Sequence, residues 1–381
     1  MPKPAVKGVA SKLKSPIPKQ RTGPLWTGPF GEGPLGGVTQ SMLGKFLVCR
    51  ERFRLRYIVG LKPTEGFSKT LEYGQLWHAC EESTAAGIEW QVGLEKYKDQ
   101  LMKKYPLQRE EVGKWYMACK MQYPIYLDYW SRHKDVIDRT PLMQEQVFDV
   151  PYTLPSGRVV RLRGKFDSVD LIGKGKNAGV WLQENKTKGS IDEALMRKQL
   201  KFDLQTMMYL TALHADPFSG YESEGHFASD FPKHPIKGVR YNVIGRPFSG
   251  KGNIKPRQAT KNQPAETPEE YWDRLQQYFI LNPEEWFMRW EANISPEEVK
   301  GFQRKCLNPL LEMLCDWYDC LEQCSGDDFE YCQRHKSTHF QFPFGVYSPL
   351  TDGGETEYDV MLDTGSDAGL KRTDELFTEL Q

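Results

Sequence analysis

Length, composition and charge exclude several classes of protein. The chain has 381 residues, with 51 basic and 51 acidic side chains and a formal net charge of zero. No stretch of eighteen apolar residues occurs and no apolar signal-peptide core begins the chain, so we expect neither a membrane span nor secretion. Eight cysteines in a chain of this length do not form a disulfide framework, and a reduced, cytoplasmic protein is the simpler interpretation.

The neutral total conceals two tails of opposite charge. Residues 1–31 contain six lysines and arginines and no acid, whereas residues 350–381 contain nine acids and two bases. Residues 1–37 are also rich in proline and glycine, which predicts a disordered basic tail that either contacts phosphates or is simply solvated. Neutrality therefore leaves room for a local basic channel and a nucleic-acid partner.

Helices are expected between this tail and the first long strand. Ser41 should cap the first of them, and its run of arginines either meets a DNA backbone or forms a solvated face. In the second, LEYGQLWHACEE, His78 and Glu82 lie one turn apart and share a face. Taken alone, His78 would more often be a hydrogen-bonded structural histidine. Residues 91–134 continue as helices, and their aromatic stripe indicates core packing rather than a base-stacking surface.

Alternating segments then predict β-hairpins that bring polar groups together. The strand PLMQEQVFDVPYTL turns at residues 154–157 into RVVRLRGKFDSVDL, in which every second residue from Val160 to Phe166 is apolar or glycine. In the next strand, GVWLQENKTK, Glu184 and Lys186 are two residues apart and project to the same side. If this strand pairs with the one before it, Asp167 lies beside Glu184. Two carboxylates and one amine would then converge.

This trio suits metal-assisted phosphate chemistry. Mg²⁺ takes oxygen ligands, commonly one or two carboxylates with water and substrate phosphate, and a nearby ammonium steadies the charge that develops on phosphorus. An acid on one strand followed by acid-x-Lys on the next resembles the PD-(D/E)XK nuclease pattern, which stands here as Asp167 and Glu184-Asn185-Lys186. The resemblance places Mg²⁺ or Mn²⁺ on Asp167 and Glu184, and gives Asp170 a supporting role.

A helix after the hairpin extends the resemblance to the RecB-type exonuclease branch of that superfamily. Ser190 and Glu193 form an S-x-x-E capping box that should start this helix. Gln205 and Tyr209 are four residues apart and share a face. The pair is similar to the Gln-x-x-x-Tyr helix of RecB-type nucleases, and the similarity implies that it orients DNA or supports the strands.

The resemblance covers roughly residues 40–245 and carries expectations about fold and role. It implies an α/β, restriction-endonuclease-like mixed sheet flanked by helices, with helical N- and C-terminal additions, over residues 38–335 and with a core at 142–245. It also implies that His78 completes the metal site, with Glu82 beside it. The implied activity is a metal-dependent DNA nuclease, in particular an exonuclease of recombination, repair or phage DNA processing, in a bacterial or phage-infected cell and with a helicase or recombination partner.

Other classes of function stay open at this point. The same fold could serve as a non-catalytic module that binds DNA ends or a partner protein. A structural or assembly protein built on the aromatic helices and the acidic tail predicts no metal dependence and no DNA affinity. An exposed hairpin with ordinary charges is the plainest alternative. The intact set of Asp167, Glu184 and Lys186 favours the enzyme.

The remainder of the chain is less informative. A strand is expected over residues 238–244, and the basic loop 246–263 either grips phosphate or is an ordinary surface loop. Thr267 and Ser295 should cap two further helices, with a short strand or a helix end between them. Residues 336–381 are expected to form an irregular extension with an acidic tail, which could mask a DNA channel.

The cysteines raise the question of an iron–sulfur cluster. Some RecB-type nucleases hold a 4Fe–4S cluster with one cysteine before the nuclease core and three after it. By that resemblance the ligands here would be Cys49, Cys320, Cys324 and Cys332. The usual Cys-x-x-Cys step is absent and no proline follows Cys49, so the cluster is disfavoured. Small apolar cysteines on a helix are the plainer interpretation.

Overall fold

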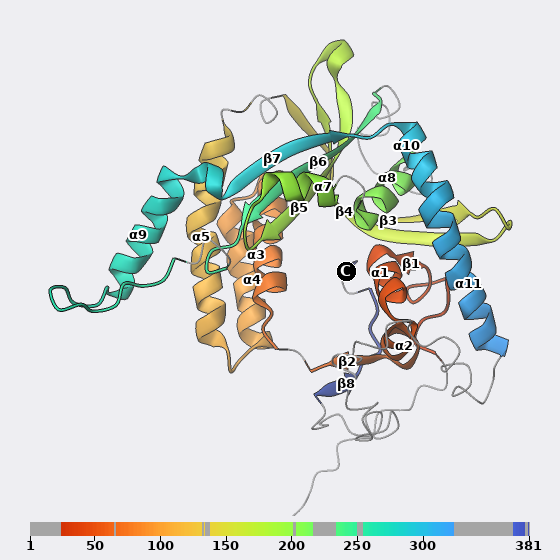
Figure 1. The fold of residues 1–381 in the computed structure, drawn as a ribbon, viewed down its shortest axis with the longest axis horizontal. Helices are drawn as coiled ribbons and strands as arrows, with labels where there is room; N and C mark the ends of the chain where they lie inside the picture. Colours follow the sequence, from red (N-terminus) through yellow and green to blue (C-terminus); the bar gives the residue numbers. More distant parts are fainter. Residues whose placement is uncertain are drawn as a thin grey trace, which may run out of the picture.

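A six-stranded mixed sheet forms the centre of the computed structural model, which describes residues 24–64, 66–131, 133, 138–200, 203–215, 234–249, 254–323, 369–377 and 380 (Figure 1). The strand order is β1-β4-β5-β6-β7, and β3 pairs with β4 outside this path. The pairs β1–β4 and β5–β6 are parallel and the others antiparallel. The strands are β1 (Val38–Thr39), β3 (Arg139–Thr153), β4 (Val159–Ile172), β5 (Gly179–Lys188), β6 (Ile236–Gly245) and β7 (Phe287–Asn293).

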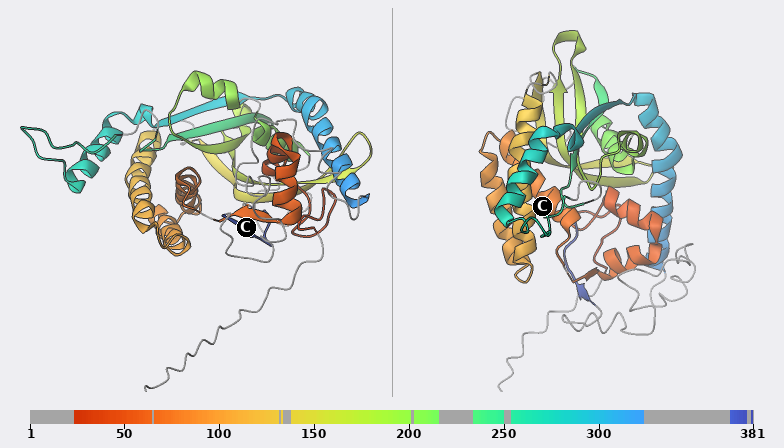
Figure 2. Two further views of the ribbon diagram at one scale, coloured as in Figure 1. Left: turned by 60° about the horizontal axis from the view of Figure 1, so that its bottom comes forward. Right: turned by 60° about the vertical axis from the view of Figure 1, so that its left-hand side comes forward.

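Helices cover both faces of this sheet, as expected of a restriction-endonuclease-like fold (Figure 2). The helices α3, α4, α5 and α9 share one apolar cluster with Ile244 and Phe287 of the sheet, whereas α1, α8, α10 and α11 share the other with the strands. The helices are α1 (Gln40–Val48), α2 (Arg50–Phe53), α3 (Lys69–Ala85), α4 (Trp90–Lys104), α5 (Arg109–Ser131), α7 (Glu193–Leu200), α8 (Leu204–His214), α9 (Pro268–Leu281), α10 (Pro296–Phe302) and α11 (Asn308–Gln323).

The predicted hairpins form as the alternation indicated. Val160, Leu162, Gly164 and Phe166 of β4 are all buried, and the turn before them closes through the hydrogen bond from Gly157 N to Leu154 O (2.9 Å). The next strand, β5, is buried from residue 179 to 185 rather than on one face only, because it lies in the middle of the sheet with helices on both sides.

The aromatic stripe of α4 and α5 is core, as predicted. Its buried members lie in the apolar cluster beneath α3 and form edge-to-face pairs such as Trp77 with Tyr123, at 5.1 Å between ring centroids. The buried members of the stripe are Trp115, Tyr116, Tyr123, Tyr126 and Trp130.

No helix in the described ranges is long and apolar enough to cross a membrane.

The N-terminal segment differs from its prediction where it is described. Composition predicts disorder through residue 37, but Leu25 and Trp26 are fully buried. Trp26 donates from Nε1 to Gly37 O (2.8 Å), and Arg163 Nη1 donates to the carbonyls of Pro34 and Gly36 (both 2.8 Å). The polar face of β4 therefore anchors the carbonyl groups of residues 31–36, which the expectation of a disordered tail did not foresee.

Several helix boundaries differ from the predicted ones. Thr39, not Ser41, caps α1, because its hydroxyl accepts from Met42 N (3.4 Å). Asp192 accepts from Leu195 N (3.0 Å) at the start of α7 in place of the predicted Ser190–Glu193 box. The helix expected to continue to Gln205 is interrupted, and α8 begins at a new cap, Asp203.

The C-terminal half follows the prediction more closely. Thr267 and Ser295 both form complete capping boxes, with proline at the first helical position. The undecided segment between them is the strand β7. The last long helix is two helices, α10 and α11, joined by a π-helical turn. The remaining turns are η1 (Arg54–Val59), η2 (Gly175–Asn177), η5 (Pro283–Glu285) and η6 (Gln303–Leu307).

The far end of the chain returns to the N-terminal half. The strand β8 (Leu370–Arg372) pairs antiparallel with β2 (Leu61–Pro63), which connects the N-terminal helices to α3. Leu376 and Phe377 are then buried in the main core. Residues 324–368, with most of the expected irregular extension and its acidic part, lie outside the described residues.

Candidate functional site

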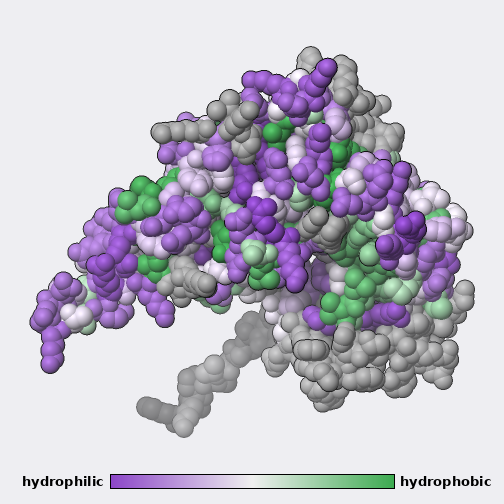
Figure 3. Space-filling view, turned by 45° about the horizontal axis from the view of Figure 1, so that its top comes forward, coloured by the Kyte–Doolittle hydropathy of each residue, from purple (hydrophilic) through white to green (hydrophobic). Residues whose placement is uncertain are grey.

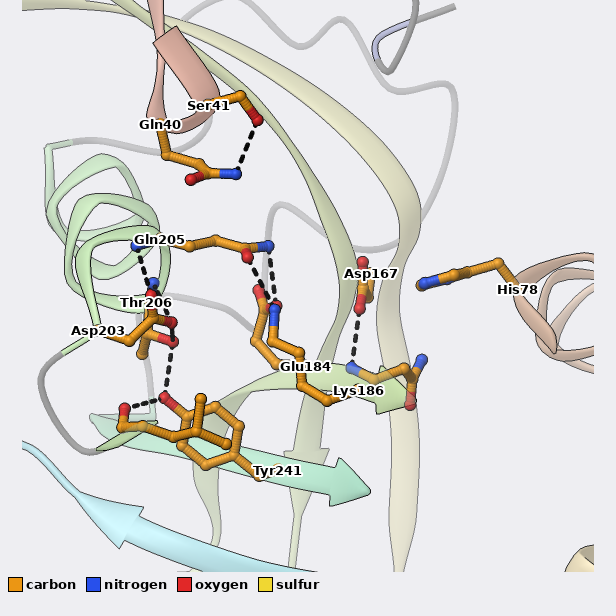
Figure 4. Close-up of polar contacts among 12 residues, drawn as sticks. Gln40, Ser41, His78, Asp167, Glu184, Lys186, Asp203, Gln205, Thr206 and Tyr241 are labelled. Atoms are coloured by element: carbon orange, nitrogen blue, oxygen red, sulfur yellow. Dashed lines mark hydrogen bonds and ion pairs between the residues drawn. The ribbon is translucent and has the colours of Figure 1, made fainter. Parts of the chain in front are cut away.

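Three side chains from three elements approach one another at one edge of β4. His78 comes from α3, Glu145 from β3 and Asp167 from β4, and one ligand atom from each lies within 4.8 Å of the others. His78 Nδ1 is 3.1 Å from Glu145 Oε1. Asp167 Oδ2 accepts from the backbone N–H of Asn185 (2.8 Å), which fixes the carboxylate against β5. Figure 4 shows His78 pointing from its helix toward Asp167.

Glu145 enters this group through an unusual backbone conformation. Its φ is +47°, in the left-handed region, although it lies within a strand and is not glycine. Its second carboxylate oxygen pairs with Lys165 Nζ (2.8 Å), so both of its oxygens are held. A residue in this region costs of order 1–3 kcal/mol and persists where its surroundings fix it, which is common at functional sites.

The acid-x-lysine pair of β5 forms a second polar group next to the first. Lys186 Nζ donates to Glu184 Oε2 (2.9 Å) and to Gln205 Oε1 (2.7 Å), while Gln205 Nε2 donates to the same Glu184 oxygen (3.0 Å). Figure 4 shows Gln205 reaching from α8 to this pair. The three side chains form a closed hydrogen-bonded ring that holds Glu184 and Lys186 in one arrangement.

Burial and neighbouring charges shift the pKa values of these groups. Burial raises the pKa of Glu184 to about 7, with Lys186 opposing the shift and Asp167 adding to it. Burial alone would lower the pKa of His78, but Asp167 and Glu145 raise it to about 9. Burial would also lower the pKa of Lys186, and Glu184 and Asp167 raise it. The site therefore concentrates negative charge that bound protons balance.

The donor set fits a divalent cation. Glu145 and Asp167 offer carboxylate oxygens, which suit Mg²⁺ and Mn²⁺, and His78 offers an imidazole nitrogen, which the transition metal Mn²⁺ accepts more readily than Mg²⁺. Glu184 Oε1 is fully buried and has no hydrogen-bond partner within the described ranges. A buried carboxylate oxygen without a partner is costly unless a cation meets it. A divalent ion would also take the place of the proton that Asp167 and Glu145 stabilise on His78.

Tyr209 packs against the strand that carries Asp167 and also lines the cavity that contains this residue. Its ring is 6% exposed and packs edge-to-face on Phe148 and Phe166, at 5.3 and 5.7 Å. A Cβ at Gly164 would lie 2.5 Å from Phe148 Cζ and 2.8 Å from Tyr209 Cε1. Glycine is therefore required at the start of GKFD, because both rings rest on the strand that carries Asp167.

Buried amides continue the site into the sheet. Asn185 Oδ1 accepts from Asn242 Nδ2 (2.9 Å), which also donates to the hydroxyl of Tyr126 (2.8 Å). Asn185, the middle residue of Glu-Asn-Lys, therefore positions the backbone N–H that holds Asp167. On the other side of the Glu184–Lys186 pair, Asp203 caps α8 by accepting from Thr206 Oγ1 (2.9 Å) and from the amides of the first turn of that helix.

Two of the predicted support residues lie apart from the ligand group. Asp170 is fully buried and pairs with Arg139 Nε (2.9 Å) and Arg240 (3.7 Å), in an ion-pair cluster inside the sheet. Glu82 is exposed and lines a neighbouring cavity with His78, but it is not one of the three converging ligands. Neither residue meets the metal group directly.

Three cavities meet at the exposed face of α3, and all three are lined by Gln75 and His78. The first, of about 400 Å³, is lined also by Asp167, Gln205 and residues 39–41. The second, about 510 Å³, shares Glu145 and Lys165 with it, and the third, about 330 Å³, contains Lys186. These are ordinary sizes for ligand sites, and together they lead past the ligand group on both sides.

The cysteines and the basic loop leave their predictions open. Cys49 is buried and its thiol accepts from Arg52 N (3.5 Å), whereas Cys320 is exposed on α11. Cys324 and Cys332 lie outside the described residues, so a cluster on these four stays a prediction. In the loop, residues 254–266 are mostly exposed, and with α9 they project from the body as a hydrophilic arm (Figures 1 and 3).

Glu145 and Asp203 are the site residues that the sequence did not reveal. Glu145 stands in QEQ, a polar strand segment where alternation gives no reason to prefer one residue. The only signal for Asp203 is an aspartate two residues before Gln205, which is the spacing of an N-cap. Both depend on backbone events, a left-handed residue and a helix break, that hydrophobic periodicity does not register.

Comparison with known proteins adds a family to this geometry. A model of the PD-(D/E)XK nuclease superfamily matches residues 38–308, well over half of the chain. The matched span contains every residue of the ligand group and of the Glu184–Lys186–Gln205 ring. A search of curated proteins finds no match. By its family match, its mixed sheet and its fold, the chain belongs to the PD-(D/E)XK nuclease superfamily.

Proposed function

We propose that this protein is a metal-dependent deoxyribonuclease that hydrolyses phosphodiester bonds, and that it acts as an exonuclease. One observation carries the proposal: the set of Asp167, Glu184 and Lys186 is complete in a family of nucleases, with Asp167 beside His78 and Glu145 at one cavity and Lys186, paired with Glu184, at the adjoining one. A non-catalytic DNA-binding module would not need a buried carboxylate oxygen left without a partner. The exonuclease assignment rests on the resemblance of the Gln205–Tyr209 helix to the RecB-type branch.

The residues divide the work according to their positions. His78, Glu145 and Asp167 would hold the cation. The unpartnered oxygen Glu184 Oε1 would be a further candidate ligand. The family commonly uses Mg²⁺ or Mn²⁺, which when bound polarises a phosphoryl oxygen and lowers the pKa of water. Lys186 would stabilise the charge that develops on the phosphate, because its ammonium is fixed by Glu184 and Gln205.

Gln205 keeps this arrangement in place from α8. Gln205 bonds to both partners of the Glu184–Lys186 pair, so neither can turn away when substrate charge arrives. Substitution of a residue that holds a metal ligand in place commonly lowers metal affinity or activity 10–100-fold. The resemblance to RecB-type proteins also supports a setting in recombination, repair or phage DNA processing, with a helicase or recombination protein as partner.

The test is cleavage of end-labelled linear DNA and of closed circular DNA, with Mg²⁺ or Mn²⁺ against EDTA. The intact chain should degrade linear DNA only with the metal, and Asp167→Asn and Glu184→Gln should each lose activity by at least about a hundredfold. Asp273→Asn, an exposed acid on α9, is the matched control and should cut like the wild type.

Each outcome bears on a separate part of the proposal. Survival of the circle supports the exonuclease, and its cleavage makes the protein an endonuclease of the same site. DNA binding without any metal-dependent cleavage by the intact chain would replace the enzyme with the binding module. Cleavage that persists in both site variants would place the activity elsewhere.

A further inference from the structure

The cavity that holds the ligand group has an apolar contribution from a distant part of the chain. Most of its lining is polar, but Leu71 of α3 and Leu380 also line it. Leu71 is 56% exposed, whereas the next two residues of α3, Glu72 and Tyr73, are buried. An exposed leucine is unremarkable by itself. Leu71 and the half-buried Leu380, however, face the same polar cavity as three candidate metal ligands, and this arrangement calls for a ligand with an apolar surface.

The segment that carries Leu380 is fixed to the body of the protein. Thr373 N donates to Gly60 O (2.8 Å) and Thr64 N to Gly369 O (2.7 Å), at the two ends of the β2–β8 pair. Leu376 is 4% and Phe377 5% exposed, and the Arg163 guanidinium lies 4.8 Å from the centroid of the Phe377 ring. Leu380 itself packs on the main core. It is thus a wall of the cavity.

Charge identifies what this wall faces. Lys165 lines the same cavity and the next one, and Lys186 lines the third, beyond Leu71. A strand whose phosphate lies at the ligand group would therefore have cations on both sides of it. Beside such a phosphate the largest apolar surface of a nucleotide is the face of its base, and bases within a duplex bury their faces against each other.

We propose that Leu71 and Leu380 contact the unpaired base next to the phosphate that is cut, so that the site takes DNA as a single strand. This inference rests on the proposed function and deepens it. The two leucines would contribute to substrate selection, while His78, Glu145 and Asp167 keep the metal. The fixed segment 369–377 would hold Leu380 in place for this contact.

The experiment pairs removal of a base with removal of a leucine. Single-stranded oligonucleotides are prepared intact or with one abasic nucleotide, stepped along the strand. Cleavage is mapped with Mn²⁺, and binding is measured with Ca²⁺, so that one readout does not require turnover. The variants are Leu71→Ala and Leu380→Ala. Leu47→Ala, a 55% exposed leucine on α1 outside these cavities, is the control, and thermal unfolding reports whether each variant is folded.

For the wild type and the control, the abasic nucleotide should slow cleavage about tenfold and weaken binding at one position next to the cut. Leu71→Ala should cleave and bind the intact strand as poorly as the abasic one, so that the difference between the two substrates vanishes. Leu380→Ala should do the same if it folds, and Leu71→Ala decides if it does not. A base effect that is absent in the wild type, or that survives Leu71→Ala in cleavage and in binding, overturns the inference.

The design separates this inference from the proposed function. Metal-dependent cleavage that ignores the missing base keeps the nuclease and removes the base contact. Absence of cleavage with the binding difference intact keeps the base contact and removes the enzyme. Equal binding of intact and abasic strands, without cleavage, removes both.

Discussion

At the scale of single residues, the sequence predicts the parts of the site that share one regular element. Glu184 and Lys186 are two apart on a strand, and Gln205 and Tyr209 four apart on a helix, so their mutual positions follow from the geometry of those elements. Glu145 could not be found in this way. Its side chain reaches His78 because its own backbone is left-handed, and the local sequence QEQ contains no glycine or asparagine to signal that.

Glu145 gives the first prediction. Glu145→Gln keeps the size of the side chain but removes one of the charges that would hold the cation. We expect the Mn²⁺ concentration for half-maximal cleavage to rise about 10–100-fold, with a smaller change in the maximal rate. A metal titration of cleavage measures both. Glu82→Gln, one turn beyond His78 but outside the ligand group, should leave the titration unchanged, and an equal effect from both variants would contradict the assignment.

The raised pKa of Glu184 gives a prediction about pH and stability in the absence of metal. The unfolded chain ionises this carboxyl near its ordinary pKa of 4.5, while burial holds the folded group protonated until about 7. Stability is therefore present at low pH and lost as the pH rises through this window, by on the order of 3 kcal/mol. His78, raised from 6.5 to about 9, loses stability in the same direction over the next window.

Thermal unfolding in EDTA between pH 4.5 and 9 measures this loss. Glu184→Gln cannot ionise, so its unfolding midpoint should rise relative to the wild type between pH 4.5 and 7 and stay parallel above that. His78→Gln should diverge from the wild type only above pH 6.5. A constant difference between Glu184→Gln and the wild type over the whole range would show that Glu184 titrates normally in the folded protein.

At the scale of elements, the strands were predictable and the helix boundaries less so. Alternation located β3, β4 and β5 because successive side chains of a strand point to opposite faces, whichever element covers the apolar face. The helix carrying Gln205 was expected to start at Ser190, but α7 ends at Leu200 and Asp203 caps a new helix, α8. A break of this kind leaves the spacing of the apolar residues nearly unchanged. Caps, rather than periodicity, decide such boundaries.

The contact between α8 and β4 gives the third prediction. In Gly164→Ala the new methyl group meets the rings of Phe148 and Tyr209, so β4 must shift away from α8. We expect a loss of about 1–3 kcal/mol in the free energy of unfolding, together with reduced cleavage, because Asp167 lies three residues along the same strand. Denaturant unfolding and cleavage rates measure the two effects.

A second glycine provides the control for that substitution. Gly113 lies in α5 with open space where a Cβ would be. Gly113→Ala should stabilise the protein by up to about 1 kcal/mol, because alanine loses less backbone freedom in a helix. Cleavage should be unaffected. If Gly164→Ala were as well tolerated, Tyr209 would not be supporting β4 as the packing indicates.

At the scale of the whole molecule, composition predicts the class of segment but not its partners. A stretch rich in proline and glycine cannot build a core of its own, and this argues for disorder. Residues 24–37 are nevertheless ordered, because other elements supply what they lack. Trp26 packs between Phe53 of α2 and Tyr318 of α11, at 5.5 and 5.2 Å between ring centroids, and so links these two helices. Such long-range contacts cannot be read from local sequence.

The last prediction tests whether this segment is part of the folded unit. Trp26 is fully buried, so Trp26→Ala should lower the free energy of unfolding by about 3–5 kcal/mol. Phe30→Ala, at a residue 36% exposed in the same segment, should stay within about 0.5 kcal/mol of the wild type. The segment leads directly into β1 and into residues 39–41 of the cavity wall, so the tryptophan variant should also bind single-stranded DNA less tightly. An unchanged unfolding midpoint in Trp26→Ala would return residues 24–37 to the disordered tail that their composition suggests.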